Sequence, residues 1–150
     1  MIYLANFLVF FFAFCMTEFL AWFIHKYVMH GFLWVLHRDH HQKDPHSFFE
    51  LNDFFFCFFA VLGSTSMIIG WDGFTWPFYI GLGITAYGFT YLTVHDIFIH
   101  RRFKIFGKTE NNYLKAIRFS HKMHHRHTDK EDGEAFGLLW VPRKYFRRNN

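Results

Sequence analysis

Three long stretches without lysine or arginine limit what this chain can fold into. They cover residues 2–24, 54–71 and 74–94, and the only charged residue in them is Glu18. A helix needs roughly 20 apolar residues to cross the hydrocarbon core of a membrane, within a range of about 17 to 25. A soluble domain of 150 residues cannot plausibly bury three such helices and 24 phenylalanines. The sequence therefore predicts an all-α integral membrane protein with about three transmembrane helices.

The basic residues predict how this protein is oriented. All 16 lysines and arginines lie in two segments, three of them between residues 26 and 43 and 13 between residues 101 and 148. Basic residues accumulate on the cytoplasmic side of a membrane. We therefore expect the segments 25–50 and 95–130 to form a cytoplasmic helical cap, with the N-terminus outside the inner (cytoplasmic) membrane. The positive charge then implies no nucleic-acid partner, and the length predicts a single domain, residues 1–150.

Ten of the 12 histidines form two copies of one pattern, HxxxxH followed by HxxHH. The first copy contains His25, His30, His37, His40 and His41. The second copy contains His95, His100, His121, His124 and His125. Histidine is the commonest metal ligand in proteins, and imidazole suits zinc, copper, iron and nickel. Ten imidazoles are too many for the four to six bonds of one ion, so the pattern predicts a site for two metal ions on the cytoplasmic side.

The spacing within each box predicts how the histidines are presented. In HxxHH the three residues are i, i+3 and i+4, so they share one face of an α-helix. In HxxxxH the two residues are i and i+5, which an ideal helix places roughly 140° apart. Such a pair converges at a local π-helical turn or where a helix ends. We also expect Asn52 or Asp53 to cap the second apolar helix, and Asn111 or Asn112 to cap the helix that carries the last box.

Acidic residues near the boxes are candidates to orient the ligands, because a metal-bound histidine usually donates its second ring N–H to a carboxylate or carbonyl. The acidic candidates for this supporting role are Asp96, Asp53 and Glu18, and His127, which follows the last box, is a further candidate. Asp96 is attractive because it lies between two histidines. We expect Asp39 and Asp129 to be surface charges or caps. His46 belongs to no box and is expected to be exposed.

The boxes and the residues around them resemble the fatty-acid hydroxylase and sterol desaturase superfamily. The segments 25–34, 49–53 (FELND) and 91–102 (YLTVHDIFIHRR) are similar to signatures of the bacterial and plant β-carotene 3-hydroxylases. The last box (HKMHH) and the segment 136–142 (FGLLWVP) fit the same family. The resemblance covers nearly the whole chain, from about Glu18 to Pro142.

This resemblance implies a non-haem di-iron monooxygenase with the ten boxed histidines as ligands. It implies the use of O₂ and two electrons from reduced ferredoxin to hydroxylate C3 of β-ionone rings, converting β-carotene through β-cryptoxanthin to zeaxanthin. The residues are compatible with this chemistry. Neutral ligands leave the positive charge of the metals uncompensated, and a membrane-embedded pocket would keep an oxidant away from water. The aromatic content of 24% could line a slot for a long rigid hydrocarbon.

Two alternatives stay open at this point. The same boxes would serve another lipid oxidase, such as a carotenoid 4-ketolase or a fatty-acyl or sterol hydroxylase, because the apolar pocket and not the histidines would select the substrate. A non-enzymatic membrane metal-binding or transport protein belongs to a different class. Transporters usually place ionisable groups within their spans, whereas here the spans hold only Glu18.

Overall fold

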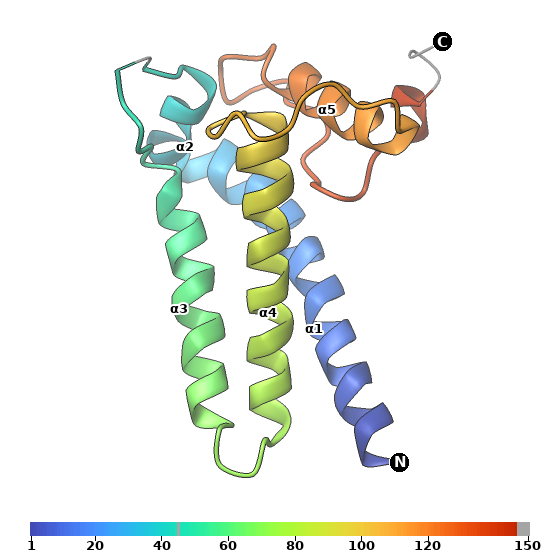
Figure 1. Ribbon diagram of the computed structural model, residues 1–150. Coiled ribbons are helices and arrows are strands. Elements are labelled where there is room, and N and C mark those ends of the chain that lie inside the picture. Colours follow the sequence, from blue (N-terminus) through green and yellow to red (C-terminus); the bar gives the residue numbers. More distant parts are fainter. Residues whose placement is uncertain (45, 147–150) are drawn as a thin grey trace.

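The computed structural model describes residues 1–44 and 46–146, and every regular element within these residues is a helix. The long helices α1, α3 and α4 stand side by side, while α2, α5 and their connecting segments lie across one end as a cap (Figure 1). The N-terminus lies at the end opposite the cap (Figure 1). The prediction of an all-α chain is confirmed for the described residues.

Helix α1 (Ile2–Ile24) runs without a break into the π-helix η1 (His25–Phe32). Gly31 leaves helical geometry, with φ −110° and ψ −123°, and the chain turns there into α2 (Trp34–His41). Taken together, α1 and η1 (Ile2–Phe32, 31 residues) form the one helix among the described residues that is long and apolar enough to cross a membrane, judged by length and composition. Helix α3 is apolar but shorter.

Helices α3 (Asp53–Ile69) and α4 (Trp76–Tyr91) form an antiparallel pair, and α4 packs on both α3 and α1. Two glycines let these backbones approach closely. A Cβ on Gly81 would lie 2.4 Å from the carbonyl oxygen of Gly63 on α3. A Cβ on Gly83 would lie 2.5 Å from the carbonyl oxygen of Phe10 on α1. Small residues at such positions are typical of helices that pack tightly against one another.

Helix α4 continues into a second π-helix, η2 (Leu92–Ile99), which carries the chain into the cap. Helix α5 (Asn112–His124) follows, and a short 3₁₀-helix, η3 (Arg143–Tyr145), lies near the end of the described chain. The side chain of Asn111 accepts hydrogen bonds from the backbone N–H groups of Tyr113 and Leu114 at 3.0 and 3.1 Å. The predicted cap of this helix is therefore confirmed at Asn111.

The start of α3 differs from the prediction in one respect. Asn52 occupies the N-cap position but makes no capping hydrogen bond with its side chain. Its Oδ1 atom instead lies 2.7 Å from Nδ1 of His37, because the histidine reaches this side chain from α2. The membrane placement of α3 and α4 stays a prediction, and the basic residues at positions 147 and 148 lie outside the described residues.

Candidate metal centre

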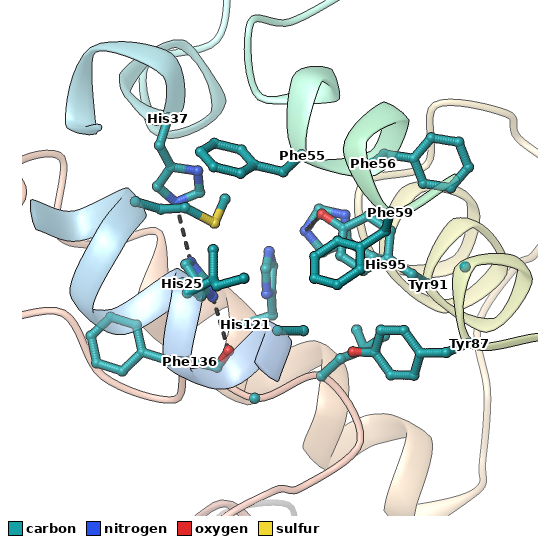
Figure 2. Close-up of a pocket in the computed structure, with 16 residues that line it drawn as sticks. His25, His37, Phe55, Phe56, Phe59, Tyr87, Tyr91, His95, His121 and Phe136 are labelled. Atoms are coloured by element: carbon teal, nitrogen blue, oxygen red, sulfur yellow. Dashed lines mark hydrogen bonds between the residues drawn. The ribbon is translucent and has the colours of Figure 1, made fainter. Parts of the chain in front are cut away.

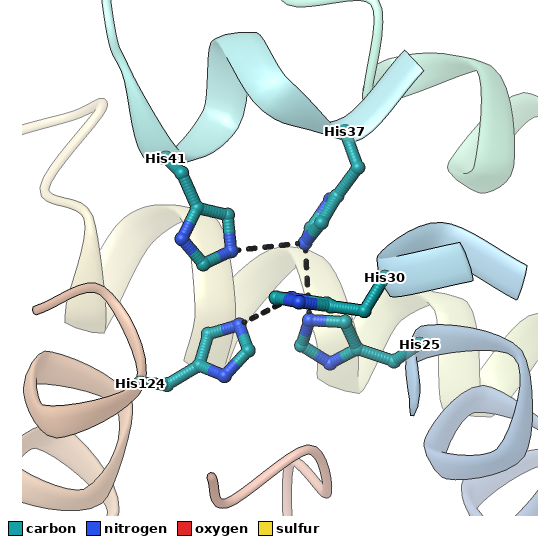
Figure 3. A group of neighbouring side chains, drawn as sticks. All are labelled: His25, His30, His37, His41 and His124. Carbon is teal, nitrogen blue, oxygen red and sulfur yellow. Dashed lines mark hydrogen bonds between the residues drawn. The ribbon is translucent and has the colours of Figure 1, made fainter. Parts of the chain in front are cut away.

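Five histidines from three elements form the first cluster, with one ring nitrogen of each lying within 4.8 Å of those of the others. They are His25, His30, His37, His41 and His124 (Figure 3). The Nε2 atom of His37 lies 3.1 Å from that of His25 and 3.2 Å from that of His41. Segments η1, α2 and α5 thus point their imidazoles at one small volume (Figure 3).

Four more histidines form the second cluster by the same criterion, namely His40, His95, His100 and His121. The Nε2 atoms of His100 and His121 lie 2.8 Å apart. His125 lies beside both clusters, since its Nε2 atom is 2.8 Å from that of His121 and its ring stacks on His41 with centroids 4.5 Å apart. The structure therefore brings all ten boxed histidines together, whereas the side chain of His46 is exposed.

Both HxxxxH boxes coincide with π-helical segments, one of the two arrangements expected from their i, i+5 spacing, and His100 forms the C-cap of η2. The backbone N–H of His100 donates to the carbonyl oxygen of His95 at 2.9 Å, which is the i to i+5 bond that defines this helix. The wider turn brings residues five apart onto one face, and the ring centroids of His95 and His100 lie 4.5 Å apart. The first pair, His25 and His30, has centroids 5.3 Å apart.

The two HxxHH boxes exchange one histidine each. His40 comes from the first half of the chain but joins the cluster of the second half, and His124 does the reverse. The expectation that all three residues of a box share one face is thus only partly right. Residues i+3 and i+4 point about 100° apart around an α-helix, and this divergence lets one short helix supply both clusters.

In the first cluster, uncharged oxygen atoms hold the outer ring nitrogens. The Nδ1 atoms of four histidines lie 2.8–3.0 Å from backbone carbonyl oxygens: His25 from Phe136, His30 from Lys130, His41 from His127, and His124 from Glu134. The fifth, His37, lies against the Oδ1 atom of Asn52. These four carbonyl groups belong to the segment between α5 and η3, residues 125–142, which we call the tail. The tail therefore fixes the orientation of these imidazoles.

In the second cluster, carboxylates contact the outer ring nitrogens of two histidines. The Nδ1 atom of His40 lies 2.7 Å from Oε2 of Glu50, and that of His95 lies 2.7 Å from Oδ1 of Asp96. Arg102 links the two acids, with guanidinium nitrogens 3.3 Å from Glu50 and 3.7 Å from Asp96. A carboxylate partner makes an imidazole a more basic ligand than a carbonyl does. The two clusters therefore differ in the groups that their outer ring nitrogens contact, although both consist of histidine.

The donor set fits a bound cation. His30 and His124 each point Nδ1 at a carbonyl oxygen, which can only accept, so in neutral rings both Nε2 atoms carry lone pairs. These two Nε2 atoms face each other at 3.3 Å, a distance at which two acceptors repel unless a cation lies between them. The Nε2 atom of His40 is buried without a hydrogen-bond partner among the described residues. Metal ions would satisfy all of these atoms.

Burial favours the neutral form, which is the form that binds metals, for several of the clustered histidines. It lowers the pKa of His41 to about 4 and that of His125 to about 3, because an imidazolium loses its hydration there. Burial also lowers the pKa of His40 and His121 well below the usual value, and the neighbouring histidines add to this effect.

An apolar pocket leads to the two clusters from the side of the long helices (Figure 2). Its wall is formed mainly by apolar and aromatic residues of α1, α3, α4 and the tail. The histidines that line it are His25, His37, His95 and His121, which belong to both clusters. Phe55, Phe56 and Phe59 of α3 line the pocket together with Tyr87 and Tyr91 of α4 (Figure 2).

The other residues predicted from the sequence differ in whether they contact a clustered histidine. Asp96 accepts from a histidine ring, whereas Asp53 contacts Arg102 at 2.8 Å. His127 contacts the first cluster through its backbone carbonyl. Asp39 accepts the backbone N–H of Leu51.

Glu18 anchors the tail. Its Oε1 atom accepts the backbone N–H groups of Leu138, Leu139 and Trp140 at 2.8–3.1 Å, and its Oε2 atom accepts the hydroxyl of Tyr87 at 2.7 Å. The acid in the first apolar stretch thus joins the helical bundle to the tail that orients the first cluster.

Sequence reasoning did not predict that Glu50, Asn52 and Arg102 would support the histidine clusters. The first two lie in the FELND segment, which served above only as a family signature. Two polar side chains at alternate positions beside an apolar stretch are a signal that could have identified them. The four backbone carbonyls of the tail leave no such signal, because any residue carries one.

The sequence of this chain is similar to known hydroxylases. Residues 10–142 match the family model described as fatty acid hydroxylase. The chain is 37% identical over 143 residues to the beta-carotene hydroxylase of Pantoea ananas, covering 95% of this chain and 81% of that protein. It is 36% identical over 125 residues to the beta-carotene hydroxylase of Pseudescherichia vulneris, covering 83% of this chain and 70% of that protein.

A plant relative is similar over a comparable part of this chain. Beta-carotene 3-hydroxylase 1, chloroplastic, of Arabidopsis thaliana is 35% identical over 133 residues, which are 85% of this chain and 41% of that longer protein. No solved structure matches the chain. The family match spans the histidine boxes, the acids beside them and the tail, and it shows that this chain belongs to the fatty acid hydroxylase family.

Proposed function

We propose that this chain is a membrane-bound non-haem di-iron monooxygenase that hydroxylates β-ionone rings at C3, taking β-carotene through β-cryptoxanthin to zeaxanthin. The observation that carries this proposal is that one apolar pocket is lined by histidines of both clusters. A rigid hydrocarbon in this pocket would present a C–H bond to both clusters at once. The choice of a carotenoid is supported by the names of the bacterial and plant relatives.

In this proposal the ten boxed histidines hold two iron ions, which when bound supply the activation of O₂. One oxygen atom enters the C–H bond and the other leaves as water, at the cost of two electrons and two protons. We propose reduced ferredoxin as the electron donor. The protein's own residues orient the ligands through the carbonyls of the tail and the acids Glu50 and Asp96.

The residues that line the pocket would also exclude water from the reaction site. Phe55, Phe56 and Phe59 of α3 and Tyr91 of α4 line the pocket with aromatic rings. A bound hydrocarbon would contact these rings and displace the remaining solvent. Phe136 packs against His25, His30 and His124 with ring centroids 5.1–5.4 Å apart, covering the first cluster. Keeping water out protects a reactive oxidant from side reactions.

The proposal places the long helices in a lipid bilayer. Support comes from the length of the helix Ile2–Phe32 and from phenylalanines that point outward along α1 and α3, such as Phe12 at 64% and Phe58 at 51% exposed. Apolar surface of this extent is expected against lipid and not against water. An apolar substrate dissolved in the bilayer could then reach the pocket without crossing water.

The test is the reaction itself. Protein purified with iron, given O₂, a reductase–ferredoxin pair and β-carotene in lipid, should yield the monohydroxylated and then the dihydroxylated carotenoid. Isotope from labelled O₂ should enter the hydroxyl group, and isotope from labelled water should not. His121→Ala should lose metal and activity because His121 lies in the second cluster. His46→Ala is the matched control and should keep both.

Other outcomes separate the alternatives. A ketone at C4 would identify a ketolase with the same histidine boxes. Absence of product, with two metal ions retained per chain and the protein folded in lipid, would favour a non-enzymatic metal-binding protein.

A further inference from the structure

The glycines of α4 have two different structural roles. Gly81 and Gly83 lie where α4 touches α3 and α1, and a Cβ at either position would come within 2.6 Å of the neighbouring backbone. Helix packing therefore requires a glycine at these two positions.

Gly88 is different. A Cβ placed on it would meet a single atom within 4 Å, Cε2 of Phe56, at 4.0 Å. This is ordinary van der Waals contact, so the fold would accept a small side chain here. Gly88 nevertheless lines the apolar pocket. The missing side chain leaves space in the pocket that the packing of the helices does not need.

The position of this space relates it to the histidines. Tyr91, three residues further along α4, stacks on His95 with ring centroids 4.4 Å apart and an interplanar angle of 22°. Gly88 lies about one helical turn before Tyr91, on the side of the bundle away from the cap. Phe56 of α3 lines the pocket beside Gly88. The pocket is therefore wider beside the stacked pair of Tyr91 and His95, and His95 belongs to the second cluster.

We propose that Gly88 is a specificity-determining residue that makes the pocket wide enough for a cyclic end group. This inference rests on the proposed function and adds the basis of its substrate class. A substituted six-membered ring is wider than an unbranched polyene chain. A straight chain would pass an alanine or a larger residue here, whereas a ring needs the space that glycine leaves.

The test measures binding and turnover for two hydrocarbons of equal carbon number, β-carotene with its two rings and the acyclic lycopene. The variants are Gly88→Ala, Gly88→Val and Gly88→Leu in the full-length, iron-loaded protein in lipid. Affinity for β-carotene should fall in this order, by about tenfold or more for leucine, because a filled pocket rejects extra methyl groups to this extent. Affinity for lycopene should change much less.

Two controls show whether the effect is local. Phe89→Leu alters the next residue of α4, whose side chain is 67% exposed and points away from the pocket lining, and it should leave binding of both ligands unchanged. Gly83→Leu should instead lower the unfolding temperature, because its side chain would clash with α1. Gly88→Ala should keep the unfolding temperature of the unsubstituted protein, and all three Gly88 variants should keep its metal content.

The outcomes distinguish this inference from the proposed function. One outcome is that the unsubstituted protein binds β-carotene more tightly than Gly88→Leu does and yet forms no product. In that case Gly88 selects the ligand and the proposed reaction is wrong. If Gly88→Leu binds and converts β-carotene as well as the unsubstituted protein, the inference is overturned. It is also overturned if Gly88→Ala unfolds the protein, since Gly88 would then serve helix packing.

Discussion

The oxygen atom that each imidazole Nδ1 contacts differs between the two clusters. Carbonyl and amide oxygens hold the first cluster, whereas Glu50 and Asp96 hold two rings of the second. A negative charge next to an imidazole strengthens its bond to a cation. Two metal ions bound here would therefore have unequal affinities although all their protein ligands are histidines.

Replacing Glu50 should weaken one metal site selectively. Glu50→Gln keeps the size of the side chain and an oxygen acceptor for His40 but removes the charge. We expect the affinity of the second cluster to fall by about 10- to 100-fold, with the first cluster little changed. An anaerobic titration with Co²⁺, followed by absorption, would resolve the two binding phases.

The matched control for this variant is Asp53→Asn, because Asp53 contacts Arg102 and no histidine ring. It should leave both phases within a few-fold of their original affinities. Equal weakening of both phases by Glu50→Gln would contradict the charge asymmetry.

The lowered pKa values predict how the metal-free protein responds to acid. His41 has a pKa of about 4 and His125 of about 3 in the folded state, against about 6.5 in an unfolded chain. Above pH about 6.5 both states are neutral and stability does not depend on these groups. Below it the unfolded chain binds protons first, so the free energy of unfolding should fall as the pH drops toward 4.

This dependence can be measured by chemical unfolding of the metal-free protein in detergent between pH 7.5 and 4.5. Each group contributes at most about 1.4 kcal/mol per pH unit. Replacing His41 and His125 with glutamine should flatten the curve, and His46→Gln should not, because His46 is exposed. Stability that increased toward low pH would contradict the assignment of neutral, buried rings.

At the scale of whole elements, the sequence predicted what periodicity and spacing determine. The i, i+5 spacing predicted a π-helical turn or a helix end at each pair, and the structure has the π-helices η1 and η2 there. The cap of α5 was found at Asn111. Apolar length predicted three long helices. The contacts that join elements far apart in sequence were not predictable in this way. Neither the exchange of His40 and His124 nor the pairing of Asn52 with His37 follows from local pattern.

The tail between α5 and η3 depends on one acid for its position. Glu18→Ala would leave three backbone N–H groups and the hydroxyl of Tyr87 without their acceptor. Hydrogen bonds to a charged group contribute about 1.5–3 kcal/mol each, although they are not additive. We expect hydrogen exchange at residues 136–140 to accelerate by tenfold or more, as measured by mass spectrometry.

Loss of this anchor should also weaken metal binding at the first cluster, because Phe136 supplies the carbonyl that orients His25. Glu110→Ala is a suitable comparison, since its carboxylate pairs with Lys115 at the surface. Unchanged exchange in the Glu18 variant would show that the tail is held by its other contacts.

At the scale of the whole molecule, the distribution of basic residues predicts topology. Single cysteines at Asp72, in the α3–α4 turn, and at Lys122, on α5, should react with a membrane-impermeant reagent from opposite sides of the membrane. The background should lack Cys15 and Cys57, which are both exposed. We expect labelling at Asp72 from outside intact cells and labelling at Lys122 only after the membrane is opened.

A third cysteine at Glu110 would serve as a control, because this residue lies in the same cap segment as Lys122. It should behave as Lys122 does. Labelling of Asp72 and Lys122 from the same side would disprove the predicted crossing of the membrane by α3 and α4.

The exchange of His40 and His124 also has a consequence for biosynthesis. Each cluster takes histidines from both halves of the chain, so neither set of imidazoles is complete until the ribosome has passed α5. By then α1, α3 and α4, the helices proposed to enter the bilayer, have already been synthesised. A nascent chain that stops before α5 presents only partial chelating sites, which hold a cation weakly. On the proposed function, neither metal site can therefore be completed before all three proposed spans have been synthesised.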